Sequence, residues 1–423
     1  MIDALIAHES PMTWLVILWG VSVALVVLSI YWYRNVLNPM AAAVVSEVVL
    51  PCALSASSAY SLLGQATYGP VELNRAIYVS LVFAVGVGAG CLVPVRPFDR
   101  LITWAFRAAS RSSGAGAMKV GQVLFLCLGI GAFGLMALWG GGGSLWLSSP
   151  RAAYMAYRSS VGPLWALSEW SLMLWLVASI WREQRGLRVL GRVAVAGCLA
   201  IFFGSKAVVL SVILVTLMHR HLRIRPLRTW VWYVSGLALF SGFVLLLYLQ
   251  SGEEARWSMY SREYVDTVCR AFQSTDLMSG EMWGAAFLSS LWGLVPRGLY
   301  PDKPYEYGVL LLHAQLFPGM AEKGSTPGVA PWTLAYMDFG VLGAVLAGFG
   351  SGRVRDAFHR AYVHQRNSIV MFVAYVQFSL WPFLLYASPA TTFALCGLLA
   401  FTTRCRRPGV RRPMAGAALR CST

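Results

Sequence analysis

Long runs of apolar residues, separated by short polar segments, follow one another along most of the chain. A helix that crosses a bilayer needs about 20 mostly apolar residues, so we expect about eleven spans, within a range of roughly ten to twelve. The expected spans are 12–33, 40–62, 75–95, 119–140, 161–181, 187–204, 205–219, 229–250, 332–350, 368–386 and 388–403. One long helix over 187–219 is an alternative, but Gly204-Ser205-Lys206 interrupts the apolar run and predicts a tight turn.

The region 251–331 is too long to be a simple connection between spans, and loops of this kind are usually functional. Within it, 260–272 has the pattern of an amphipathic helix, which we interpret as lying on the membrane surface. The apolar stretches 282–295 and 308–317 suit interfacial or re-entrant segments. The chain thus divides into an N-terminal transmembrane bundle of about eight helices (1–250), a large loop containing short helices (251–331), and C-terminal transmembrane helices with a basic tail (332–423).

The composition agrees with this pattern. Hydrophobic residues make up 57% of the chain and charged residues 12%, against about 25% charged residues in a typical soluble domain. So little polar surface would not cover a soluble core, and so many apolar residues exclude a disordered chain. We therefore expect an all-α polytopic membrane protein.

The net charge of +16 is explained by where the positive residues lie. If the N-terminus is outside and the spans alternate, most of the 34 Lys and Arg residues fall on the inner side, as the positive-inside rule requires. These include the arginines expected in the connection after 332–350, which are Arg353, Arg355, Arg360 and Arg366. The charge predicts an outer N-terminus and an inner C-terminus, and it gives no reason to expect nucleic-acid binding.

The sequence contains no nucleotide-binding loop, nucleophile elbow or metal-ligand spacing. The glycines at 140–143 lack the Lys-Ser/Thr of a phosphate loop, and we interpret them as a flexible exit from a span. The 8 cysteines and 6 histidines form no ligand constellation. Cys269 is the one thiol expected outside, so no intramolecular disulfide is predicted there. We expect neither a metal nor a cofactor.

Three separated cations are expected near the outer interface. Lys206 lies at the hairpin turn, and Arg297 and Lys303 lie among apolar and proline residues of the large loop. An arginine fork binds phosphate oxygens in bidentate fashion and a lysine adds a point charge, so these cations suit an anionic headgroup such as a lipid diphosphate. The alternative is that Arg297 pairs with Asp302 or Glu306, and that Lys206 only extends toward the interface.

Three carboxylates, Glu47, Glu169 and Asp338, fall inside expected spans, where ionisable residues are often functional. For Glu47 and Glu169, hydrogen-bonded contacts between helices are the simpler explanation. Asp338 is expected in the outer third of its span, close to Gly340.

The sequence PRGLYPDKPYEYG at 296–308 contains a Pro-Arg pair, an aromatic-Pro-x-Lys-Pro segment, and an arginine separated by ten residues from a glycine. Ser325-Thr326-Pro327 and YMDFGVLG (336–343) follow it, and Gly204-Ser205-Lys206 precedes it. In order and sidedness these motifs resemble those of bacterial oligosaccharide repeat-unit polymerases, the Wzy-type O-antigen and exopolysaccharide polymerases. Two positions depart from the pattern, because Lys206 replaces a usual arginine and Asp338 a usual asparagine.

The resemblance implies a GT-C-like glycosyltransferase of the bacterial inner membrane, with a periplasmic N-terminus and large loop and a cytoplasmic C-terminus. Its substrate would be an undecaprenyl-diphosphate-linked oligosaccharide, used without a nucleotide sugar. A chain-length regulator and a flippase of the same pathway are the implied partners, besides the membrane lipids.

On this resemblance Arg297 binds the diphosphate leaving group, with Lys303 and Lys206 assisting. A general base then helps the acceptor hydroxyl to attack, and the residues do not choose among the candidates Glu306, Asp302, Asp338 and His313. The structural positions of the motif are Pro296, Pro301, Pro304, Gly308 and Gly340. Of these, Gly308 is expected to permit close packing or an unusual turn.

Two other functions stay open. An O-antigen ligase has a similar topology and a large outer loop, and His313 is compatible with it, although the Pro-Arg and Lys-Pro pairs favour a polymerase. The non-enzymatic alternative is a lipid-linked oligosaccharide transporter. Transporters usually show repeated halves and helices broken near the midplane, and the sequence indicates neither.

Overall fold

The computed structural model describes residues 8–35, 37–107, 115–181, 183, 186–224, 227, 257–294, 300, 302–304, 306–318 and 328–380. Every regular element in these ranges is a helix, and they contain no β-strand. In the same ranges five helices are long and apolar enough to cross a membrane: Pro11–Tyr33, Pro39–Ser61, Pro70–Leu92, Lys119–Trp139 and Thr333–His364. The chain is therefore a multi-pass helical membrane protein, as its hydropathy pattern predicted.

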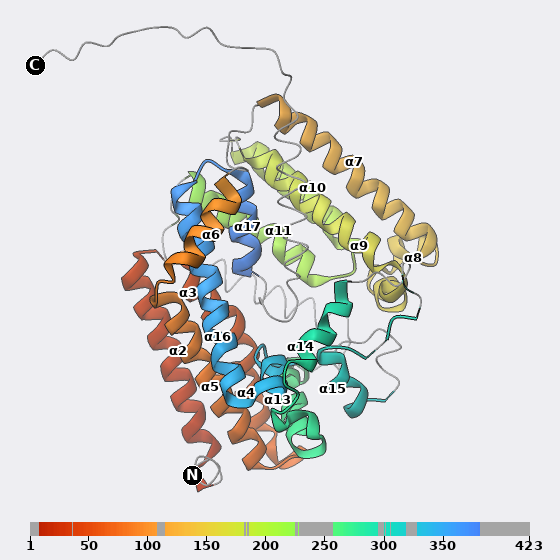
Figure 1. Cartoon of the computed structure of the whole chain (residues 1–423). Helices are drawn as coiled ribbons and strands as arrows, with labels where there is room; N and C mark the ends of the chain where they lie inside the picture. Colours follow the sequence, from red (N-terminus) through yellow and green to blue (C-terminus); the bar gives the residue numbers. More distant parts are fainter. Residues whose placement is uncertain are drawn as a thin grey trace, which may run out of the picture.

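One group of helices is built from the N-terminal part of the chain and α16 (Figure 1). Its long members are α2 (Pro11–Tyr33), the continuous helix formed by α3 (Pro39–Ala43), η1 (Val44–Leu54) and α4 (Ser55–Ser61), α5 (Pro70–Leu92) and α16 (Thr333–His364). The large loop adds α13 (Trp257–Ser274), η5 (Asp276–Ser279), α14 (Ala285–Ser290), η6 (Leu291–Leu294) and α15 (Val309–Leu316). These elements, apart from η6, share one apolar core, in which Phe83, Trp332 and Met337 are fully buried.

A second group lies beside the first (Figure 1). It contains α7 (Ala115–Trp139), α8 (Gly143–Ser148), α9 (Pro150–Ile180), α10 (Gly186–Ile201), α11 (Lys206–His219) and η3 (Arg220–Ile224). α17 (Ile369–Leu380) packs against α9, α11 and α16, and α6 (Arg96–Arg107) packs against α16. The expected spans 229–250 and 388–403 lie outside the described residues.

Prolines mark where several helices begin. Pro11, Pro39, Pro70 and Pro150 each stand in the first turn of a helix, where the missing N–H has no intrahelical partner to lose. Asn38 caps the second of these helices, because its side chain accepts a hydrogen bond from the Ala41 N–H at 2.7 Å.

The hairpin predicted at Gly204-Ser205-Lys206 is confirmed. α10 ends at Ile201 and α11 begins at Lys206, so 187–219 forms two helices. Gly204 has φ +65°, and a Cβ there would overlap the Pro150 carbonyl oxygen. Only glycine therefore fits at this position, where the turn between α10 and α11 packs against the first residue of α9.

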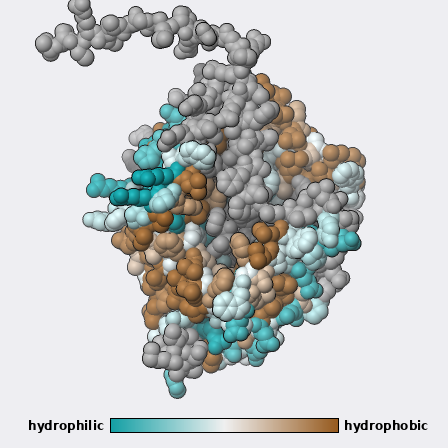
Figure 2. All heavy atoms as spheres, in the orientation of Figure 1, coloured by the Kyte–Doolittle hydropathy of each residue, from teal (hydrophilic) through white to brown (hydrophobic). Residues whose placement is uncertain are grey.

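The predicted inner segments meet at one end of the molecule. His221 Nε2 lies 2.8 Å from Asn35 Oδ1, the Arg223 guanidinium stacks on Trp181, and Arg223 donates to the Asn367 side chain at 2.6 Å. At the opposite end are the start of α2, α13, α14 and α15 (Figure 1). In Figure 2 polar residues gather over α6 and over α13–α15, and apolar residues cover α2 and α7 between them. This arrangement fits spans that run between two polar ends.

Glycines let α5 and α16 approach closely. Gly86 and Gly90 of α5 face Gly348 and Gly352 of α16, and a Cβ at any of the four would overlap backbone of the other helix. Both pairs have the small-xxx-small spacing that brings membrane helices together. α16 is therefore held against α5 along several turns.

The expected inner loop after 332–350 is wrong, because α16 continues to His364. Arg353 and Arg355 consequently lie inside this helix and are buried. Arg355 pairs with Glu47 at 2.9 Å, and the two side chains are 0% and 1% exposed. Arg353 pairs with Asp99 and with Asp356. These arginines extend the helix beyond its apolar part because each finds a carboxylate on a neighbouring element or one turn away.

The glycine contact predicts a difference between two positions on one helix. Gly352→Leu should destabilise the protein by about 1–3 kcal/mol or more, since the side chain must enter packed backbone. Gly350→Leu is the matched control, because a Cβ at Gly350 meets no heavy atom within 4 Å. Thermal unfolding in detergent, followed by fluorescence-detected size exclusion, checks this. Equal melting temperatures for the two variants would contradict the close packing.

Candidate functional site

The large loop is anchored on the helix bundle. Val265, Val268 and Cys269 of α13 are fully buried in the core shared with α4 and α5, and the Val265 N–H donates to Ser55 Oγ at 2.9 Å. The expected helix at 260–272 is confirmed, and its apolar face is covered by protein. Its expected place on the membrane surface stays a prediction. Burial, together with the nearby Asp266 and Glu72 carboxylates, raises the pKa of the Cys269 thiol well above its usual value.

The YMDFGVLG segment contains a break in α16. Phe339 (φ −140°, ψ 18°) and Gly340 (φ 59°, ψ −143°) depart from helical geometry. The carbonyl oxygens of Met337 and Asp338 accept hydrogen bonds from the N–H groups of Met282 and Trp283 at 3.1 and 3.0 Å. The break is therefore filled by backbone of the large loop.

Asp338 caps α14. One carboxylate oxygen accepts the Ala286 N–H and the other the Phe287 N–H, both at 2.9 Å, and the residue is 1% exposed. A carboxylate at a helix N-terminus satisfies free N–H groups and complements the helix dipole. Asp338 was a candidate general base, but this geometry commits both of its oxygens to holding α14.

Two glycines allow the loop backbone to approach the break in α16 closely. Gly280 has φ +83°, and a Cβ there would lie 2.6 Å from the Gly340 Cα. Gly340 itself has φ +59°, which side chains rarely adopt. The motif position Gly340 thus serves the break in α16 and a close contact with the loop.

α14 in turn holds the end of the 296–308 motif. Ser289 Oγ accepts the Gly308 N–H at 2.9 Å, and a Cβ at Gly308 would lie 2.9 Å from the Ser290 Cβ. Gly308 has φ +56° and ψ −128°, so both the close packing and the unusual turn expected of it are observed. A continuous path of hydrogen bonds therefore runs from Asp338 through α14 to Gly308.

Lys303 lies in a turn that is braced by aromatic rings. Its N–H donates to the Tyr300 carbonyl oxygen at 3.1 Å, and Tyr300 stacks on Trp292 at 5.5 Å between ring centroids. The Lys303 ammonium lies 4.6 Å from the centroid of the Tyr307 ring, and the residue is only 8% exposed. A cation held at an aromatic face in this way is positioned rather than freely solvated.

The other candidates differ in exposure. Glu306 and Asp302 are exposed, as is Pro304. His313, on α15, is 4% exposed and packs edge-on against Phe317. Lys303, Gly308 and His313 thus belong to one short stretch of the large loop, and Gly308 attaches this stretch through α14 to Asp338.

Several predicted residues lie outside the described part of the chain. These are Pro296, Arg297, Pro301 and the segment Ser325-Thr326-Pro327. Lys206 is described by its backbone, as the first residue of α11. The arrangement of Arg297 and Lys206 relative to Lys303 therefore stays a prediction.

Two partners, one in the loop and one in α16, were not predicted from the sequence. Ser289 carried no motif, so its hydrogen bond to Gly308 had no sequence signal. Glu47 was recognised as a charge within an apolar run, and the expected helix contact is confirmed. Its partner Arg355 was missed because it was counted as a loop arginine. Glu169 is buried in α9.

Comparison with protein-family models, with curated proteins and with solved structures finds no match for this chain.

The capping role of Asp338 can be tested by hydrogen exchange. Asp338→Ala should expose the Ala286 and Phe287 N–H groups and cost about 0.5–2 kcal/mol, the usual loss for an N-cap. The loss of stability in Asp338→Asn should lie between that of the wild type and that of Asp338→Ala, because the amide oxygen still accepts one of the two hydrogen bonds. Mass-spectrometric exchange of the peptide spanning α14 measures this, with exposed Asp302→Ala as the control. Unchanged exchange in Asp338→Ala would show that the carboxylate does not cap α14.

Proposed function

We propose that this protein is a glycosyltransferase that polymerises undecaprenyl-diphosphate-linked oligosaccharide repeat units at the periplasmic face of the bacterial inner membrane. The product would be an O-antigen, a capsule or an exopolysaccharide. The observation that carries the proposal is that two motif regions distant in sequence meet in space. The loop motif, through Gly308 and Ser289, is bonded to the helix that Asp338 of the second motif caps.

The proposed reaction needs little from the protein besides positioned charge. The bond between the donor sugar's anomeric carbon and the diphosphate oxygen breaks, and its electron pair leaves with the diphosphate. A hydroxyl of a second lipid-linked unit forms the new bond to the same carbon and loses its proton to a base. In our proposal Arg297 and Lys303 stabilise the leaving diphosphate, and Lys206 adds a third positive charge.

Asp338 is a poor base because both its oxygens accept backbone hydrogen bonds. This leaves Glu306 and Asp302, which are exposed, and the buried His313 as candidates. All three lie within ten residues of Lys303 in the sequence, which supports each as a member of the proposed site. We propose that one of them takes the proton.

The membrane arrangement belongs to the same proposal. We propose about eleven spans in a GT-C-like bundle, with a periplasmic N-terminus and a cytoplasmic C-terminus. Two observations support it: the expected inner segments converge at one end, and the large loop lies at the other (Figure 1).

Among the described residues, the break in α16 is a feature that favours a transporter, because transporters use discontinuous helices near the midplane. In this chain the break at Phe339 and Gly340 lies only a few residues after the start of α16 at Thr333. Its freed carbonyl groups are occupied by Met282 and Trp283. Both facts fit a loop anchor better than a transport site.

The proposal predicts that Arg297→Ala abolishes polymer formation in cells while the protein still inserts in the membrane. Arg297→Lys should retain little activity, because a lysine lacks the bidentate fork. Arg366→Ala is a suitable control, since Arg366 is exposed at the end opposite to the loop. Arg353 is unsuitable, because it is buried in ion pairs. Full-length polymer from the Arg297→Ala variant would refute the site assignment.

The reaction itself is tested with purified protein and a synthetic lipid-linked repeat unit. A ladder of oligomers should form without nucleotide sugar or added metal. In cells, a deletion mutant should still transfer single repeats to the lipid A core, whereas loss of a ligase would leave none. Folded protein that gives no ladder under any condition would count against the proposal.

A further inference from the structure

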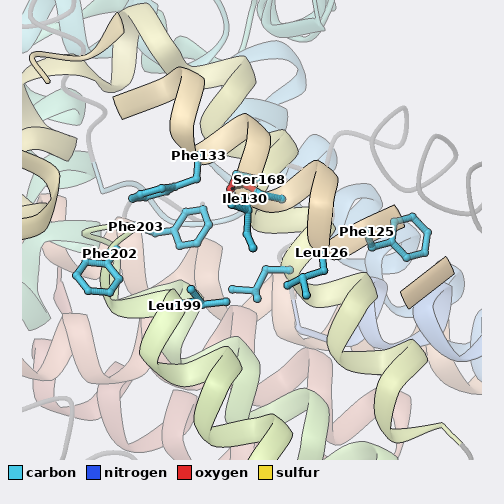
Figure 3. Close-up of a pocket in the computed structure, with 10 residues that line it drawn as sticks. Phe125, Leu126, Ile130, Phe133, Ser168, Leu199, Phe202 and Phe203 are labelled. Atoms are coloured by element: carbon cyan, nitrogen blue, oxygen red, sulfur yellow. Dashed lines mark hydrogen bonds between the residues drawn. The ribbon is translucent and has the colours of Figure 1, made fainter. Parts of the chain in front are cut away.

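An apolar groove lies between α7, α9 and the end of α10 (Figure 3). Its volume is about 190 Å³. The residues that line it are Phe125, Leu126, Gly129, Ile130, Phe133, Ser168, Leu172, Leu199, Phe202 and Phe203. Ser168 is the one polar side chain in the lining, and its hydroxyl donates to the Gly129 carbonyl oxygen at 2.7 Å. The groove therefore presents only apolar surface to an occupant.

The groove is elongated and open. Figure 3 shows Phe125 and Leu126 at one end and Phe202 and Phe203 at the other, with Ile130 between them. Ile130 is 56% exposed, so the groove can be entered from the surface of the bundle. From Phe125 to Phe133 it follows α7 for about 12 Å, taking 1.5 Å per residue. Such a shape holds part of one extended chain.

One end of the groove leads to positive charge. Phe203 is followed by the hairpin turn at Gly204, and Lys206 begins α11 directly after it. Arg151, in the first turn of α9, stacks on Tyr154 and donates to the Gly204 carbonyl oxygen at 3.4 Å. An amphiphile with its chain in the groove would thus place its headgroup beside the Arg151 guanidinium.

We propose that this groove binds the isoprenoid chain of a polyprenyl phosphate or diphosphate, with the headgroup at the Gly204 turn. The assignment rests on the proposed function for the identity of the lipid. Within a bilayer an apolar groove gains little from the hydrophobic effect, because lipid tails are equally apolar. Selectivity must come from fit and charge, and an elongated groove that ends near the Arg151 guanidinium suits a lipid with one branched chain and an anionic headgroup.

The test uses a polyprenyl diphosphate analogue that carries a photoactivatable diazirine on its chain, with the full-length protein in lipid nanodiscs. Labelling should map to peptides from α7 and from the end of α10. Ile130→Trp, which fills the groove, should lower labelling at least about tenfold, the factor that 1.4 kcal/mol of lost binding gives. Leu135→Trp is the matched control, because Leu135 is exposed on the same helix but does not line the groove.

Two further sets of variants test the groove and the headgroup position independently. Ser168→Leu fills the groove from α9, so the test does not depend on the folding of one variant. Arg151→Gln should weaken labelling and Arg151→Lys should restore part of it. Equal labelling of Ile130→Trp and Leu135→Trp, or equal competition by phosphatidylglycerol and by unlabelled polyprenyl diphosphate, would overturn the proposal. Since labelling needs no turnover, a labelled groove without an oligomer ladder would refute only the proposed function, and a ladder without groove labelling only this inference.

Discussion

The close contact between α5 and α16 is the constraint on which the rest of the structure depends. Membrane helices gain little from apolar burial against each other, so van der Waals contact and hydrogen bonds must hold them. Gly86 and Gly90 face Gly348 and Gly352 without a Cβ between the two backbones, and Cys91 Sγ lies 3.3 Å from the Gly352 carbonyl oxygen. α16 is thereby fixed, and it carries the loop anchor at one end and the buried ion pairs toward the other.

The buried charges give α16 its register. Arg355 pairs with Glu47 of the neighbouring span, while Asp356 accepts the Tyr33 hydroxyl at 2.7 Å and pairs with Arg353 at 2.9 Å. Burying paired charges adds little net stability, but leaving one unpaired costs several kcal/mol, roughly 3–5 when a partner is removed. A shift of α16 by one turn would break these pairs. The charges therefore select one position of α16 along α5. The glycine contacts alone would allow α16 to shift along its axis.

Hydropathy and turn chemistry predicted the helices but not their partners. The hairpin at Gly204 was visible because a tight turn depends on residues close in sequence, whereas Gly308 was recognised only as a position of the loop motif. Arg355 was misread as a loop residue because a hydropathy window sees a charge and not the distant carboxylate that neutralises it. Asp338 was read as a base for the same reason, since its partners are backbone N–H groups about fifty residues upstream, whose positions are set only by the fold.

The position of the candidate site is set by α16, to which the large loop is hydrogen-bonded, and not by the loop alone. Helices as short as α14 and α15 are unstable on their own, because a helix of fewer than about 12 residues is marginal in water. A break in a membrane helix is equally unfavourable unless its freed backbone groups find partners. Near Gly340 the broken helix and the short loop helix stabilise each other. Backbone N–H groups of the loop donate to the free carbonyl groups of Met337 and Asp338, and the Asp338 side chain caps α14. The position of the Lys303–His313 stretch is consequently set by the helix bundle, which explains how a long loop can hold a defined geometry there.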